Sequence, residues 1–90
     1  MEKSIYTRDY KAMLLLLREV RKAAGVTQIE LASRLGTTQS FVTKCERGDR
    51  RLDLIQMRTI CDALGTTLPE FVRQLEERLP TPKRKPGSRR

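Results

Sequence analysis

The 90-residue chain contains no histidine, no tryptophan and only two cysteines, and aromatic residues make up 4% of it. Histidine is the most common metal ligand and a frequent general base, so its absence argues against acid–base catalysis and a zinc site. Cys45 and Cys61 are too few and too far apart for a zinc cluster or a disulfide scaffold, and we expect both to pack in the core. Paired carboxylates and a glycine-rich phosphate loop are also missing. We therefore expect no enzyme, no bound metal and no cofactor.

Long hydrophobic segments are missing as well. The apolar run Met13–Leu17 has five residues, whereas a helix needs about 20 to cross a bilayer. Residues 1–11 are polar and of mixed charge, unlike a secretory signal peptide. We therefore expect a cytoplasmic protein without a membrane span. A chain of this length suits one domain with a small core and leaves no room for a separate effector-binding domain.

Positive charge is abundant but uneven. Lysine and arginine number 19 against 11 acidic residues, which gives a formal net charge of +8. Such a balance favours a polyanionic partner: a nucleic acid, an anionic membrane or an acidic protein. Five of the bases lie in residues 83–90, within a Pro-rich segment that lacks large apolar residues. We expect residues 1–79 to form the domain and residues 80–90 to be a disordered basic tail, because the tail cannot offset its ordering entropy.

Apolar residues recur every three to four positions, which predicts helices and no strand. The expected helices run from about Thr7 or Asp9 to Ala24, from Thr27 to Leu35, from Thr38 to about Arg47, from Asp53 to Leu64, and from Thr67 to Leu79. The apolar stripe expected on the fourth helix consists of Leu54, Met57, Ile60, Cys61 and Leu64. Capping boxes are expected at Thr27–Glu30, Asp53–Gln56 and Thr67–Glu70, where paired side chains would satisfy the free amides of a first turn.

The two short helices around residues 27–47 are the most informative feature. Gly36 lies in the turn between them, where a positive φ is easiest to accommodate. Ala32 is small at the point where the helices would cross. The apolar contacts that would fix this crossing come from Leu31, Leu35, Val42 and Cys45. This arrangement predicts a helix-turn-helix, whose second helix can enter the major groove of DNA.

The segment Gln28–Ser40 reads QIELASRLGTTQS, and Val42 and the segment Cys45–Gly48 follow it. This pattern resembles the helix-turn-helix of the Cro and phage-repressor (XRE) family over roughly residues 14–75. Thr37 and Cys45 stand where that family more often has Val and Leu or Ile, but both fit a small apolar slot. The resemblance implies an all-α, compact five-helix bundle of the lambda-repressor-like DNA-binding type, which is usually a homodimer on a two-fold operator.

The resemblance also implies roles for individual residues. Base contacts would come from Gln39, Ser40, Thr43 and Lys44. Phosphate contacts would come from Gln28, Arg47, Arg50 and Arg51. Gln28 would also brace Gln39, and Arg21 and Glu46 would form a partly buried structural ion pair. An ordinary solvated surface is the alternative interpretation for these polar residues.

We therefore predict a sequence-specific, duplex-DNA-binding transcriptional regulator: a dimeric repressor of bacterial or phage type that reads the major groove with residues 38–47. A phage-type repressor, an antitoxin and a controller of a restriction system all remain open within this class. The alternative is an adaptor that binds protein or RNA through the same fold without base readout. The expected partner is an inverted-repeat operator, and no small-molecule effector is evident. A dimer seam would draw on Leu15, Leu16, Val72, Leu75 and Leu79, unless the first helix buries these residues against the fifth.

Overall fold

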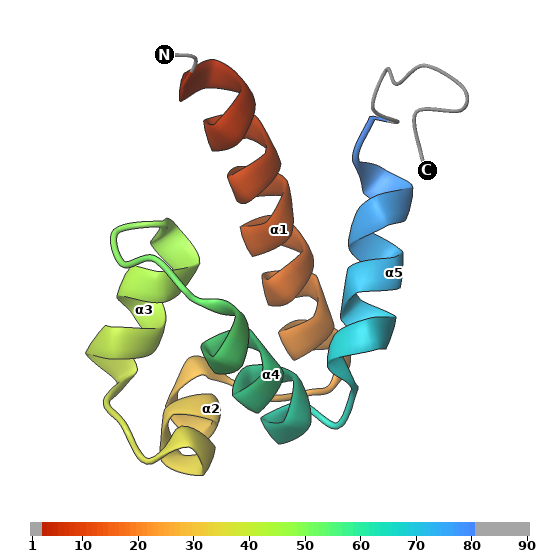
Figure 1. The fold of residues 1–90 in the computed structure, drawn as a ribbon. Coiled ribbons are helices and arrows are strands. Elements are labelled where there is room, and N and C mark those ends of the chain that lie inside the picture. The colour runs from red at the N-terminus through yellow and green to blue at the C-terminus, as the bar shows by residue number, and fades with distance from the viewer. Residues whose placement is uncertain (1–2, 81–90) are drawn as a thin grey trace.

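The computed structural model describes residues 3–80, which contain five α-helices and no β-strand (Figure 1). The helices are α1 (Lys3–Ala23), α2 (Gln28–Leu35), α3 (Gln39–Arg47), α4 (Leu54–Ala63) and α5 (Leu68–Arg78). The predicted all-α architecture of five helices is confirmed. The start of α1 was predicted too late, because Thr7 and Asp9, residue types that often cap a helix, lie inside it. The predicted basic tail, apart from Pro80, lies outside the described residues.

The four shorter helices begin at polar N-cap residues. These are Thr27, Thr38, Asp53 and Thr67, and each side chain accepts a hydrogen bond from the backbone N–H three residues later. Only α4, among the described helices, has a complete capping box, in which the Gln56 side chain accepts from the Asp53 N–H at 2.8 Å. The capping boxes predicted for α2 and α5 were wrong, because the carboxylates of Glu30 and Glu70 pair instead with arginines one turn further along their own helices.

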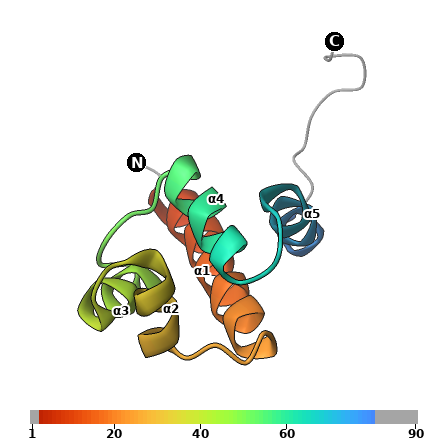
Figure 2. The same cartoon turned by 90° about the horizontal axis from the view of Figure 1, so that it is seen from below.

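The hydrophobic core lies between α1 and the other helices. Seen from below, α2 and α3 lie on one side of α1 and α5 lies on the other (Figure 2). The most deeply buried side chains are Leu16 and Leu17 of α1, Leu31 of α2, Cys61 of α4 and Phe71 of α5. Val42 and Cys45 attach α3 to the bundle, with 3% and 2% of their surface exposed. Every helix therefore contributes to one core, which holds α3 at the edge of the molecule.

One apolar prediction was wrong. Leu54 was expected on the buried stripe of α4, yet it is 65% exposed, and its neighbour Ile55 is 68% exposed. The reason is that the first turn of α4 extends beyond the helices that bury its later turns. Leu16 was one of five residues of which some were expected at a dimer seam, and it is 1% exposed because it faces inward from α1, in line with the alternative of burial within one chain. Leu15 and Val72 do remain exposed on the surface.

Gly36 forms the turn between α2 and α3. Its φ is +70°, in the left-handed region that side chains disfavour, and its N–H donates to the Ser33 carbonyl at 3.1 Å. The chain can thereby leave α2 and reach Thr38, the N-cap of α3, after only one residue beyond Gly36, namely Thr37. This tight connection fixes the angle at which α3 crosses α2.

Candidate nucleic-acid interface

The outer face of α3 carries the four residues predicted to contact bases. Gln39, Ser40 and Lys44 are exposed and Thr43 is half-buried. They share one face because residues three and four apart in a helix are neighbours. The opposite face holds the residues that anchor α3 to the core. The structure therefore brings the four predicted residues together on an accessible surface.

Gln28, the first residue of α2, is hydrogen-bonded to α3. Its Nε2 donates to Glu46 Oε1 at 2.9 Å, and its Oε1 accepts from the Thr43 hydroxyl at 2.8 Å. The resemblance had implied that Gln28 braces Gln39. In the structure Gln28 braces Thr43 instead. Thr43 lies nearer the middle of α3, and its hydroxyl supplies the hydrogen that the Gln28 carbonyl oxygen accepts. These two bonds fix the start of α2 against α3.

Arg21 and Glu46 form a buried ion pair between α1 and α3. The Arg21 Nε donates to Glu46 Oε2 at 2.6 Å, and its Nη2 donates to Oε1 at 3.1 Å. Its Nη1 donates to the Val26 carbonyl at 2.9 Å. Only 7% of Arg21 and 5% of Glu46 are exposed, so both charges depend on these bonds to replace water. The two-pronged geometry holds the last turn of α3 against α1.

The Glu46 carboxylate remains ionised despite its burial. Burial alone raises its pKa, but hydrogen bonds from Arg21 and Gln28, together with the charges of Arg21 and Arg18, outweigh that effect. The pKa of Glu46 is therefore held below its ordinary value. The Arg18 Nε lies 3.7 Å from the same carboxylate. The end of α3 thus carries a negative charge at neutral pH that is bound by internal partners.

Three arginines predicted to contact phosphates lie at the end of α3. Arg47 is its last residue, and Arg50 and Arg51 follow in the loop before α4; all three are exposed. The Arg47 Nη2 lies 3.2 Å from Asp49 Oδ2. Exposed pairs of this kind contribute only about 0–1 kcal/mol, so an incoming phosphate can replace Asp49 at little cost.

Two aromatic rings support the loop between α3 and α4. The Arg50 guanidinium lies 5.1 Å from the centre of the Phe41 ring, and the Arg51 guanidinium lies 4.2 Å from that of Tyr10. The Tyr10 hydroxyl also accepts from the Leu52 N–H at 3.0 Å. Stacking on a ring leaves the N–H edges of a guanidinium available to other acceptors. The sequence offered no signal for Tyr10, because this residue lies upstream of the recognised pattern.

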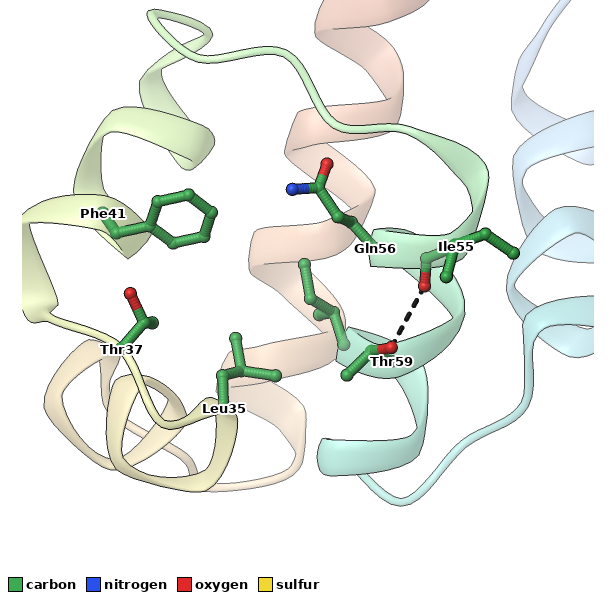
Figure 3. A pocket seen from close by; sticks show the side chains of 7 residues that line it. Leu35, Thr37, Phe41, Ile55, Gln56 and Thr59 are labelled. Atoms are coloured by element: carbon green, nitrogen blue, oxygen red, sulfur yellow. Dashed lines mark hydrogen bonds between the residues drawn. The ribbon is translucent and has the colours of Figure 1, made fainter.

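An apolar pocket of about 260 Å³ lies between the start of α3 and α4 (Figure 3). It is lined by Leu35, Thr37, Phe41, Ile55, Gln56, Thr59 and Ile60. Phe41 and Gln56 point toward one another across the pocket (Figure 3). None of the lining residues is charged. The uncharged lining of the pocket includes Ile55 from the exposed start of α4, and the sequence did not reveal this surface.

The two cysteines take no part in this surface. Cys45 and Cys61 are 2% and 1% exposed, and burial raises the pKa of both thiols. Within residues 3–80, no group of three or more His, Cys, Asp or Glu residues could hold a metal ion. No helix in the same part of the chain is long and apolar enough to cross a membrane.

An accessible helix carried by a helix-turn-helix, with basic residues where it ends, defines a DNA-binding domain. A family model described as helix-turn-helix matches residues 17–71, more than half of the chain. The chain therefore belongs to the helix-turn-helix family of XRE-type DNA-binding regulators.

Individual relatives agree with this assignment. The chain is 40% identical over 65 residues to an uncharacterized HTH-type transcriptional regulator from Methanothermobacter thermautotrophicus, a match that covers 72% of this chain and 94% of the relative. An XRE-family like protein from Pseudomonas syringae pv. tomato superposes with a TM-score of 0.80 at 47% identity, over 87% of this chain and 95% of that one. The clp gene regulator ClgR of Corynebacterium glutamicum superposes with a TM-score of 0.68 at 25% identity, over 77% and 88% of the two chains.

Proposed function

We propose that this protein is a sequence-specific repressor of transcription that binds duplex DNA as a dimer in the cytoplasm. The observation that carries the proposal is the outer face of α3, where Gln39, Ser40, Thr43 and Lys44 lie together on an accessible surface. A glutamine amide can pair with both N6 and N7 of adenine, and a lysine can donate to O6 and N7 of guanine. The names of the relatives, which are regulators of transcription, support the same class.

Phosphate contacts would orient α3 in the groove. Arg47, Arg50 and Arg51 present exposed guanidinium groups where α3 ends. Gln28 lies in the first turn of α2, where free backbone amides attract a phosphate. Its side-chain amide donates one hydrogen bond to Glu46 and has a second hydrogen for a phosphate oxygen. These contacts would add affinity without sequence preference, whereas α3 would supply the discrimination.

Selection of bound duplexes from a random pool at about 150 mM salt tests the proposal. We expect one enriched sequence arranged as an inverted repeat, because two copies of α3 related by a two-fold axis read two identical half-sites. Placing that sequence across a promoter should reduce transcription in proportion to its occupancy. Uniform binding without an enriched sequence would contradict base readout and would favour the adaptor that uses the same fold.

The dimer surface that we propose is the uncharged surface around Ile55. At an isologous two-fold interface each residue near the axis meets its own copy, so a surface without charge is favoured there. Ile55 lines the pocket and is 68% exposed, so that a second copy can fill the recess with its own Ile55. Leu15 is a poorer candidate because it shares a pocket with Lys11 and Arg18, whose like charges would meet across the axis.

Replacing Ile55 by Asp is expected to weaken the dimer at least about tenfold. Burying an exposed isoleucine stabilises an interface by about 1.5–3 kcal/mol, and burying an unpaired carboxylate adds a further cost. Sedimentation equilibrium measures the effect, and circular dichroism checks that the monomer remains folded. Val72→Asp, at the exposed residue of α5, is the matched control and should leave the dimer intact. Weakening by Val72→Asp alone would place the interface on α1 and α5.

A further inference from the structure

We infer that a basic pocket between α1 and the loop after α3 binds a DNA phosphate beyond the bases that α3 reads, with Lys11 as its main contact. This inference rests on the proposed function and extends its binding surface. The pocket has a volume of about 410 Å³ and is lined by Thr7, Tyr10, Lys11, Leu14, Arg47, Gly48 and Arg51. Lys11 lies upstream of the segment that resembles the repressor family, and nothing in the sequence pattern singled it out.

The charges of this pocket are all of one sign. Lys11 comes from α1, Arg47 from the end of α3 and Arg51 from the loop, and no acidic residue lines the pocket. Asp49, which lies outside the lining, pairs with Arg47 on the exposed side. The three cations still repel one another, and an anion placed among them lowers that electrostatic energy. A recess lined by one sign of charge also concentrates the field and attracts the opposite ion. The chemistry of the pocket therefore fits a phosphate group.

The pocket continues the predicted DNA-binding face. Ser40, Lys44 and Arg47 follow one another at intervals of four and three residues, so they form a single stripe along α3. Arg47 ends this stripe and lines both the basic pocket and an adjoining one that contains Lys11 and Arg18. The stripe is about 10 Å long at 1.5 Å per residue. Along one DNA strand this corresponds to about three nucleotides, which places the pocket at a phosphate flanking the bases read by α3.

The pocket is held in shape before any ligand binds. The Tyr10 hydroxyl accepts from the Leu52 N–H, and the Arg51 guanidinium stacks on the Tyr10 ring. Gly48 passes so close to α1 that an added Cβ would lie 3.3 Å from Leu14 Cδ1. The loop therefore lies against α1 with little freedom, and a phosphate gains contacts without first ordering the loop.

The partner we commit to is the backbone of duplex DNA. Lys11, Arg47 and Arg51 are all exposed, so a small free anion would be held weakly against solvent and salt. A phosphate within a duplex that α3 already holds binds without the entropy loss of a separate association. The geometry thus favours a phosphate delivered by the same duplex that α3 contacts.

The test measures how the affinity of the Lys11→Gln variant for DNA changes with salt, on the selected sequence and on an unrelated duplex. We expect the negative slope of log affinity against log salt to become shallower by about 0.9 for each bound protomer, on both duplexes. In ethylation interference, one phosphate per half-site, outside the bases that α3 reads, should weaken binding of wild type when ethylated but should no longer affect Lys11→Gln. Lys11→Arg should restore both signals, because it restores the charge.

Arg58→Gln is the matched control, since it removes one exposed charge from α4 outside the basic pocket. An unchanged slope for Lys11→Gln, or the same change for Arg58→Gln, would overturn the inference. The inference would also be overturned if inorganic phosphate or anionic lipid vesicles competed with DNA for wild type but not for Lys11→Gln, because the pocket would then bind those anions. If wild type selects no sequence but the slope still falls, the proposed specificity fails while the pocket stands. If wild type binds no duplex, both fail.

Discussion

Replacing Glu46 by Ala is expected to lower the free energy of unfolding by about 3–5 kcal/mol, because it leaves the Arg21 guanidinium buried without its counter-ion. It also removes the acceptor of the Gln28 side chain. A small domain has only about 5–15 kcal/mol of stability in total, so the variant should be close to unfolding at 37 °C. Urea denaturation followed by circular dichroism measures the change.

The matched control is Glu30→Ala, which removes a carboxylate from an exposed pair with Arg34. That change should cost no more than about 1 kcal/mol. Equal costs for Glu46→Ala and Glu30→Ala would show that the ion pair between α1 and α3 does not support the fold.

Acid should reveal the same ion pair. The pKa of Glu46 is lower in the folded protein than in the unfolded chain, so the carboxylate stabilises the fold fully above the unfolded pKa of about 4.3. That contribution is lost as the pH falls through the lower folded pKa. The Glu46→Gln variant cannot titrate there, and its stability should therefore decline less than that of wild type over this range.

Replacing Gln39 by Ala is expected to lower specific affinity by about fivefold or more for each half-site. A side chain that pairs with a base edge through two hydrogen bonds contributes about 1–3 kcal/mol of discrimination. Affinity for an unrelated duplex should stay within about twofold, because the phosphate contacts proposed for the loop are left intact. Fluorescence anisotropy on the two duplexes at one salt concentration measures the ratio.

Gln74→Ala, in α5, serves as the control, since Gln74 bonds to Glu70 within its own helix. Its ratio of specific to unspecific affinity should equal that of wild type. If Gln39→Ala weakened both duplexes equally, the outer face of α3 would act through general affinity, and base readout by Gln39 would be excluded.

The sequence predicted α2 and α3 well because their limits depend on neighbouring residues. Thr38 caps α3 and Gly48 ends it in a left-handed conformation, and both signals are visible within a few positions. The exposed face of α3 follows from the same helical period. For this part of the molecule, local chemistry and tertiary packing agree.

Features that depend on distant partners could not be predicted in the same way. Gln28 accepts from Thr43, a residue 15 positions away, and nothing in the local pattern distinguishes that partner from Gln39. Tyr10 bonds to Leu52, 42 positions further along the chain. The exposure of Leu54, which lies on the apolar stripe of α4, likewise depends on which helices pack nearby, and periodicity does not encode that.

The two deeply buried cysteine thiols can report on local opening of the structure. Cys45 lies in α3 and Cys61 in α4, so a thiol-specific reagent reaches each atom only while the surrounding packing is open. The reactivity of Cys45 follows partial detachment of α3 from the bundle, whereas that of Cys61 follows disruption of the core. The ratio of the two modification rates distinguishes local opening of α3 from unfolding of the whole bundle.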